Sequence, residues 1–294
     1  MIKTAKALIE LCREKDWKIS DYVLEEESRG DEEKKAAILK ELHHMLAIMK
    51  ESTSRTLESG TNLNHDLIKD FGKKTWEYSK SGKKFVTDEK TLRAMARAFS
   101  TFESNAKMDV IVAAPTAGSC GIVPAALVTA AEDIDASDDE LVEALLTSIG
   151  IGQFIAGYGT FAGSEGGCQA ECGAASSMAA MAAAALAQLY GGDVETCLNA
   201  ASIAIVNILG LVCDPLGGLV QYPCTFRNAS GVSNARVSAD MALAGTYSII
   251  PFDEVCKAMK EVGDAMPASL RETGIGGLAG TDTAKNLCGK IFGK

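Results

Sequence analysis

Four glycine-rich loops carry the residues of this chain that are best suited to chemistry, and five of the nine cysteines lie in three of them. Glycine at this density costs chain entropy unless the backbone must bend sharply or approach a ligand closely. A helix that starts after such a loop presents backbone N–H groups, which form a positive concavity suited to anions. The loops span residues 114–121, 163–173, 213–228 and 271–280.

The cysteines of the second and third loops are candidates for a metal centre. Cys168 and Cys172 lie in one loop, and Cys213 and Cys224 lie in the next. Their irregular spacing matches neither the paired C-x2-C of a zinc ribbon nor the C-x2-C-x2-C run of a ferredoxin. Three loop cysteines brought together by packing could hold an iron–sulfur cluster in which one iron lacks a protein thiolate and acts as a Lewis acid. The residues alone leave open the alternative that each is a small buried apolar side chain.

The charge is distributed unevenly. Residues 108–226 contain no Lys or Arg and thirteen acids, so this segment has a charge of −13 in a chain of net charge −10. Without clustered cations, nucleic acid and anionic membrane surfaces are unlikely partners. The segment also lacks the Schiff-base lysine of a pyridoxal-phosphate enzyme, so we expect no such cofactor. Backbone N–H groups of residues 116–121 are then the main local means of holding a carboxylate, unless that loop is only a tight turn.

These loops must be positioned by helices, because the chain shows no convincing alternating strand pattern. We expect a mostly α fold: one compact helical domain over residues 1–294, with buried Ala-rich helices, glycine-rich catalytic loops and an N-terminal helical portion over residues 1–60. Residues 60–90 are expected to connect, with short helices. Further helices are expected at 87–106, from near Pro124, from a capping box at Ser137 and Glu140 through Leu146, at 173–190, at 194–209 after a Gly191–Gly192 junction with Asp193 as N-cap, at 233–247 and at 252–263.

The remaining features predict a soluble chain with reduced thiols. The N-terminus has no long apolar segment before its charges, and an odd number of cysteines argues for the cytoplasm. Residues 172–192 and 196–213 are uncharged but rich in Ala, Gly and Ser, so we expect buried helices rather than membrane spans. The following are expected to be structural: Cys12, Cys197 and Cys256 as buried apolar residues, His43 and His44 as solvated or packed, and the acidic run from Glu132 to Glu143 as a solvated face and helix start. His65, in a polar loop, stays open.

At these loops the chain resembles the alpha chain of the bacterial two-chain, iron–sulfur-dependent L-serine dehydratase. The resemblance covers nearly the whole chain, and the order and spacing of its four motifs are highly specific. The motifs are APTAGSCGIVPA, GSEGGCQAECGAASSMAA, LGLVCDPLGGLVQYPC with Arg227 and Asn228 shortly after it, and MPASLRETGIGGLAGT.

The resemblance implies a [4Fe–4S] cluster held by Cys168, Cys213 and Cys224, with Cys172 as an alternative ligand. The iron without a protein ligand would bind the substrate hydroxyl and make it a better leaving group. A base would remove the α-proton, and the aminoacrylate would tautomerise and hydrolyse to pyruvate and ammonia. From their positions, we expect these residues to bind the substrate carboxylate: Thr116, Gly118 and Ser119 of the loop, with help from Asn228 and either Arg227 or Arg271.

The chain departs from single-chain members of that family in two ways. It lacks their Ser-Ser-Ser-His-Thr stretch, so the resemblance implies a separate beta chain, with a histidine of that chain as one candidate for the unassigned general base. Cys288 is displaced from the terminal cysteine that can occupy the open iron, so we give it no role. Two alternatives remain: an L-cysteine desulfidase on a related scaffold, and a non-catalytic iron–sulfur or zinc protein.

Overall fold

Helices form almost all of the regular structure. The computed structural model describes residues 2–61, 63, 67–189 and 192–292, with the backbone alone for 181–189. In this part of the chain there is no strand, only one isolated β-bridge between Cys213 and Arg271, so the predicted mostly α fold is confirmed. The helices are α1 (Ala5–Lys15), α2 (Ile19–Ser28), α3 (Glu32–Ser52), α4 (Phe71–Ser79), α5 (Glu89–Ala106), α6 (Ile122–Ile134), α7 (Asp138–Ala156), α8 (Gly163–Gly166), α9 (Cys168–Leu189), α10 (Val194–Val206), α11 (Cys224–Leu243), α12 (Phe252–Ala265) and α13 (Asp282–Phe292).

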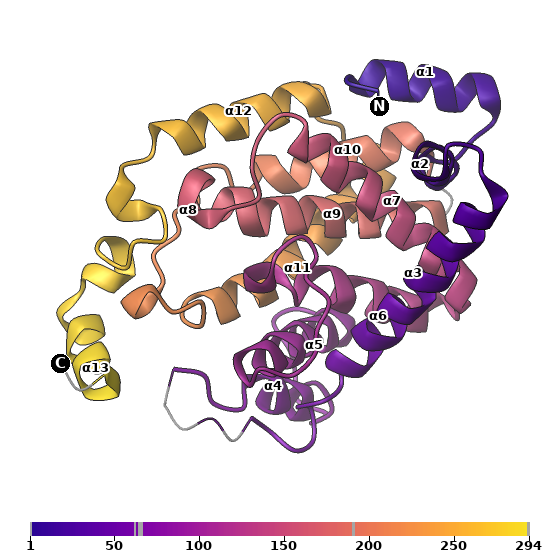
Figure 1. Ribbon diagram of the computed structural model, residues 1–294. Coiled ribbons are helices and arrows are strands. Elements are labelled where there is room, and N and C mark those ends of the chain that lie inside the picture. Colours follow the sequence, from indigo (N-terminus) through magenta and orange to yellow (C-terminus); the bar gives the residue numbers. More distant parts are fainter. Residues whose placement is uncertain (1, 62, 64–66, 190–191, 293–294) are drawn as a thin grey trace.

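Helix α9 lies at the centre of the fold and packs against α6, α7, α10 and α11 (Figure 1). Its small side chains permit these close contacts; Ala174, Ala175 and Ala179 are all fully buried. Helix α11 approaches through Gly231, where a Cβ atom would lie 2.5 Å from Ile122 Cδ1 and 2.9 Å from a hydroxyl of α9. The prediction of buried Ala-rich helices is therefore confirmed.

Two helices begin earlier than the sequence pattern predicts. Helix α9 begins at Cys168 rather than at residue 173, directly after Gly167, whose φ of +73° breaks the chain direction. Helix α11 begins at Cys224 rather than at residue 233. The expected loops at these two cysteines are thus first turns of buried helices, and tertiary packing outweighs the local glycine content.

Other boundaries follow local capping chemistry. The capping box of Ser137 and Glu140 opens α7 as predicted, but the helix continues to Ala156 rather than ending at Leu146. The Asp193 side chain caps α10 as predicted, by accepting a hydrogen bond from the Thr196 amide. The expected junction at Gly191 lies outside the described residues. The N-terminal helix ends at Ser52 rather than at Gly60, since residues 53–59 form turns.

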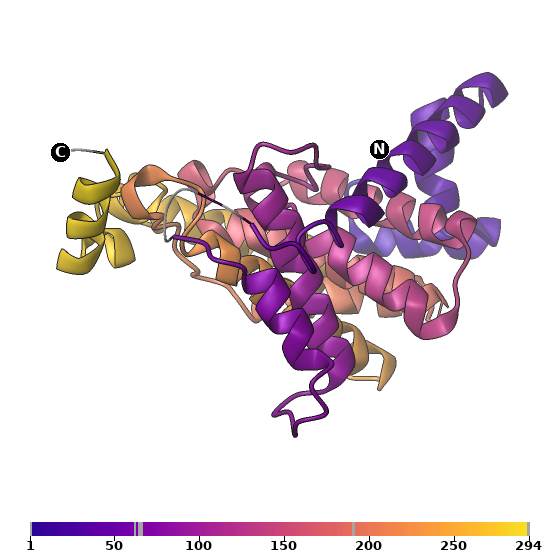
Figure 2. The ribbon, with the colours of Figure 1, turned by 90° about the horizontal axis from the view of Figure 1, so that it is seen from below.

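The N-terminal helices α1–α3 and the C-terminal α13 lie at opposite ends of the molecule (Figures 1 and 2). Helices α2 and α3 pack on α7, while α13 packs beside the 213–228 and 271–280 segments. Helix α13 was not predicted. That the whole chain forms one catalytic unit stays a prediction. One stretch, Ala117–Ile134, is long and apolar enough by composition to cross a membrane, but 67% of it is buried inside this protein.

The acidic run from Glu132 to Glu143 is the solvated face and helix start that its composition predicts, with the exception of Asp133 in the last turn of α6. The Asp133 side chain is only 3% exposed and lies 3.4 Å from the charged nitrogens of Lys90 and Arg93. Arg236 of α11 approaches it at 3.6 Å. Cations from outside the segment without Lys or Arg therefore neutralise its inner acids, because a buried carboxylate requires a partner.

Helix α4 is held by a buried carboxylate instead of a conventional N-cap. Glu103 of α5 is fully buried, and its Oε1 accepts hydrogen bonds from the Phe71 and Gly72 amides at 2.7 and 3.2 Å. The Thr56 hydroxyl donates to Oε2 at 2.5 Å. Burial raises the pKa of Glu103, against the opposing effect of these bonds. One side chain thus joins the end of the N-terminal helical portion to α4 and α5.

We expect Glu103→Ala to lower the free energy of unfolding by about 2–3 kcal/mol, because it leaves two helix N-terminal amides without an acceptor. Glu103→Gln keeps one acceptor oxygen and should lose less. Urea titration followed by circular dichroism measures the change. Glu77→Ala, on the exposed face of α4, is the matched control. Equal stability of Glu103→Ala and the control would contradict this capping role.

Candidate active site

Four buried thiols from three chain segments converge at the starts of α9 and α11. The Sγ atoms of Cys168 and Cys172 lie 3.3 Å apart, one helical turn from each other. The Cys213 thiol lies near enough to lower the pKa of Cys168. Cys224 is near enough to interact electrostatically with Cys168. All four side chains are at most 1% exposed, so the packing assembles a sulfur-rich space inside the fold.

One of these thiols is electrostatically distinct in the metal-free chain. Hydrogen bonds from Cys172 and Cys213, with the Arg227 guanidinium nearby, hold the pKa of Cys168 well below its usual value. The pKa values of Cys172 and Cys213 are raised chiefly because their thiols donate to Cys168. Burial is the largest cause of the raised pKa of Cys224. Since thiolates are the metal-ligating form, the lowered pKa favours the form of Cys168 that can bind a metal.

Arg227 is the cation of this space. Its Nη2 lies 2.5 Å from Asp214 Oδ1, and Asp214 Oδ2 in turn accepts the Leu278 amide at 2.7 Å. The Nη1 atom of Arg227 is buried and has no hydrogen-bond partner among the described residues. This ion pair therefore leaves one guanidinium donor available next to the thiols.

Cys213 is positioned by the backbone of the fourth glycine-rich segment. Its amide donates to the Leu270 carbonyl at 2.8 Å, and its carbonyl accepts the Glu272 amide at 2.6 Å. Glu272 has a φ of +63°, which is uncommon for a residue with a side chain. These two bonds form the isolated bridge of the fold and tie the third cysteine to residues 270–272.

The predicted carboxylate loop lies against the thiols. Residues 117–119 form a single 3₁₀ turn capped by Thr116, whose Oγ1 accepts the Ser119 amide at 3.3 Å. The amides of Ala117 and Gly118 have no acceptor in the described part of the chain. These two N–H groups are available donors of the loop, and the predicted role of the loop in binding a carboxylate stays a prediction.

Glu171 is the site residue that the sequence analysis missed. Its carboxylate is 6% exposed and accepts a hydrogen bond from the Thr116 hydroxyl at 2.7 Å. Burial, then the Cys168 charge, raises the pKa of Glu171 to about 7. With Cys168 and Cys172 it forms a set whose ligand atoms all lie within 4.8 Å of one another, as a metal site requires. The available signal was its position, one turn after Cys168 in an otherwise uncharged helix.

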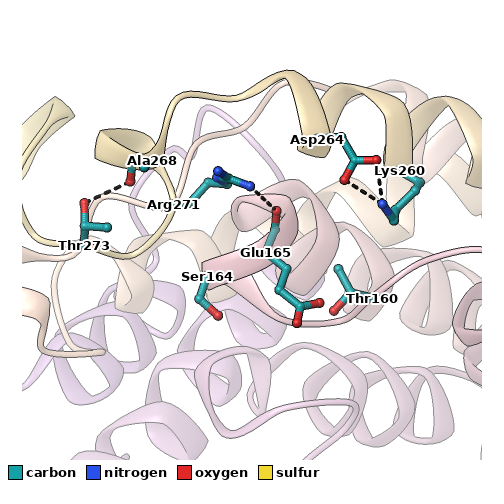
Figure 3. Close-up of a pocket in the computed structure, with 8 residues that line it drawn as sticks. All are labelled: Thr160, Ser164, Glu165, Lys260, Asp264, Ala268, Arg271 and Thr273. Atoms are coloured by element: carbon teal, nitrogen blue, oxygen red, sulfur yellow. Dashed lines mark hydrogen bonds and ion pairs between the residues drawn. The ribbon is translucent and has the colours of Figure 1, made fainter.

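Asn228 and Arg271, the two remaining residues predicted to bind the substrate, lie in different surroundings. The Asn228 amide is fully buried and bonds to the backbone of residues 118, 121 and 224. The Arg271 side chain lines a pocket of about 340 Å³, where its Nη1 donates to the Glu165 carbonyl at 3.3 Å (Figure 3). That pocket also contains the ion pair of Lys260 and Asp264. The substrate-binding role of Arg271 stays a prediction.

Histidine does not enter this assembly in the described residues. His43 on α3 pairs with Asp139 at the surface, with Nε2 3.2 Å from Oδ1, and His44 is exposed on the same helix. His65 lies outside the described residues. Cys288 is half-buried on α13, apart from the four thiols. A general base is therefore not identified among the described residues.

Comparison with known proteins places the chain among serine dehydratases. The family described as "Serine dehydratase alpha chain" matches residues 14–279. The chain is 54% identical to the L-serine dehydratase alpha chain of Peptoniphilus asaccharolyticus, over 98% of this chain and 97% of that one. It is 42% identical to the probable L-serine dehydratase alpha chain of Bacillus subtilis, over 100% and 96%. A 37% identical L-serine dehydratase of Mycobacterium bovis is longer: the alignment covers 94% of this chain but only 60% of that protein.

We expect Gly163→Ala to lower the free energy of unfolding by about 1–3 kcal/mol, because overpacking forces buried neighbours to move. The added Cβ would lie 2.8 Å from Cys213 Sγ and 3.2 Å from Glu272 Oε2. The matched control is Gly159→Ala, whose nearest new contact is an ordinary 3.6 Å. Urea unfolding of the metal-free, reduced proteins measures both. If Gly163→Ala is as stable as the control, the tight packing at Cys213 is contradicted.

Proposed function

This chain belongs to the serine dehydratase alpha chain family, and from that premise we propose that it deaminates L-serine to pyruvate and ammonia with a [4Fe–4S] cluster. The proposed ligands are Cys168, Cys213 and Cys224. One observation carries the proposal: buried thiols from three distant segments share one space, beside an arginine donor that has no partner. A lyase of small amino acids needs such a protected site, and degradation of L-serine is the reaction that we assign to it.

The residues present fit an iron–sulfur cluster. Thiolates are the ligands that such clusters take in proteins, and hydrogen bonds to their sulfurs tune them. The unpartnered Nη1 of Arg227 is a suitable donor for that purpose. Three thiols suffice to hold the cluster, so Cys172 remains an alternative ligand. When bound, the cluster supplies a Lewis acid that weakens the bond to the substrate hydroxyl.

The chain's own residues are proposed to bind and orient the substrate. The free amides of Ala117 and Gly118 would hold the carboxylate, and the free donor of Arg227 would assist them. The Thr116 hydroxyl already donates to Glu171, and the Ser119 hydroxyl to Thr116, so these two side chains would shape the loop. Oriented amides bind anions well because they need no reorganisation on binding. Burial of the site excludes water while the α-proton and the hydroxyl depart. The aminoacrylate then tautomerises and hydrolyses to the two products.

A separate beta chain is the proposed partner. The name of the Peptoniphilus asaccharolyticus relative designates an alpha chain, and the Mycobacterium bovis relative extends well beyond the region that this chain matches. We propose that the base that removes the α-proton comes from this partner, with a histidine as the candidate. No disulfide joins the cysteines of the described residues, which supports the cytoplasm as the compartment. We propose no role for nucleic acid, membrane or pyridoxal phosphate.

We expect anaerobic protein, co-expressed with the proposed beta chain, to contain about four irons per chain and to form pyruvate from L-serine. Iron analysis, visible absorbance and a lactate dehydrogenase-coupled pyruvate assay measure these properties. Sulfide release from L-cysteine without turnover of L-serine would support the desulfidase instead. A colourless zinc protein that is inert with both amino acids would refute the lyase.

We expect Cys213→Ala to lose most of its iron, because the site then offers two of the three proposed thiolates. Cys172→Ala should retain iron, since Cys172 is only the alternative ligand. Cys256→Ala, a fully buried cysteine on α12, is the matched control for the loss of a buried thiol. Iron content per chain after anaerobic reconstitution is the measurement. A fully loaded, active Cys213→Ala enzyme would overturn the ligand assignment.

A further inference from the structure

The loop of residues 116–121 is bound on two sides by side chains of α9 and α11, the helices that begin at the proposed metal ligands Cys168 and Cys224. On one side, Glu171 stands one turn into α9, after Cys168, and its Oε1 accepts the Thr116 hydroxyl at 2.7 Å. The fit there is tight, since a Cβ atom on Gly118 would lie 2.4 Å from the same oxygen. The carboxylate therefore occupies the space that a side chain at residue 118 would need.

On the other side, Asn228 stands one turn into α11, after Cys224. Its Oδ1 accepts the Gly121 amide at 2.9 Å, and its Nδ2 donates to the Gly118 carbonyl at 2.8 Å. The second N–H of Nδ2 donates to the Cys224 carbonyl at 2.9 Å. Both donors of the amide are thus in use, and the side chain is fully buried. An amide in this state has no donor left for a substrate.

We propose that Glu171 and Asn228 are positioning residues that fix the 116–121 loop to the first turns of α9 and α11, so that the substrate carboxylate is held at a set place relative to the metal ligands. The kinetic part of this inference rests on the proposed function, and the structural part does not. It gives Asn228 a different role from the direct substrate contact predicted from sequence. It also gives Glu171, which sequence analysis missed, the role of accepting the hydrogen bond from the Thr116 hydroxyl.

Amide hydrogen exchange of the full-length, reduced chain tests the structural part. We expect Glu171→Ala and Asn228→Ala to speed exchange in residues 116–121 by about tenfold or more, the effect of losing a buried hydrogen bond. Glu171→Gln should restore wild-type exchange, because the amide keeps an acceptor oxygen for the Thr116 hydroxyl. The control is Glu165→Ala, an exposed glutamate of α8.

Thr116→Val keeps the experiment decisive if Glu171→Ala does not fold. It removes the hydroxyl that donates to Glu171 and also the acceptor of the Ser119 amide, so exchange is compared at the other residues of the loop. It should speed exchange to the same extent, and the double variant Thr116→Val with Glu171→Gln should add nothing further. Wild-type exchange in Thr116→Val, or equally fast exchange in Glu171→Gln and Glu171→Ala, would overturn the proposal.

In the loaded two-chain enzyme, Glu171→Ala should raise KM for L-serine more than it lowers kcat, at unchanged iron content, and Glu171→Gln should restore KM. Unchanged KM in Glu171→Ala, with the loop exchange increased, would overturn the kinetic part alone. Failure of the wild-type enzyme to form pyruvate would refute the proposed function instead, and the exchange pattern would still decide the structural part.

Discussion

The close packing of α9 against α11 sets the places of Cys168, Cys172 and Cys224 at the candidate site. Both helices begin at a buried cysteine, so the separation of the two helix starts determines how far apart the proposed ligands Cys168 and Cys224 lie. Gly231 makes this approach possible, because a side chain there would collide with Ile122 and with a hydroxyl of α9. Small residues on the facing surfaces let helix axes come close. The alanine content of the central segment is thus a geometric requirement of the site.

The distribution of charge complements this packing. The segment that supplies all four site thiols contains no Lys or Arg, so the cations that pair with it come from residues outside 108–226. Three of them surround Asp133, and one, Arg227, lies near Cys168. Asp214 fixes that guanidinium through one nitrogen only. The site therefore contains one oriented positive charge rather than several mobile ones, which favours a defined binding geometry.

The sequence permitted good predictions wherever local hydrogen bonds decide the structure. The capping box at Ser137 and the N-cap Asp193 depend on neighbours three residues away, and both were predicted. The starts of α9 and α11 depend instead on distant packing, such as the bond from the Gln169 amide to the Leu211 carbonyl. Glycine content around Cys168 and Cys224 therefore indicated loops where the chain is helical.

The same distinction applies to the candidate site residues. The cysteines and the 116–121 loop were identified because their residue types and spacing are unusual. The contact between Glu171 and Thr116, and the use of both Asn228 donors by the backbone, join residues far apart in sequence. No local pattern indicates which way Arg271 points. Residue type predicted the chemistry, and only the fold determines which polar side chains remain available for it.

The backbone bridge at Cys213 has a consequence for the order of events when the protein is made. Two of the site cysteines begin helices, but Cys213 is held by residues 270 and 272, near the end of the chain. A nascent chain that has emerged only as far as α12 contains all four site thiols without the segment that positions this one. The backbone position of Cys213 is therefore fixed only after residues 270–272 have been made, well after all four site thiols have been synthesised.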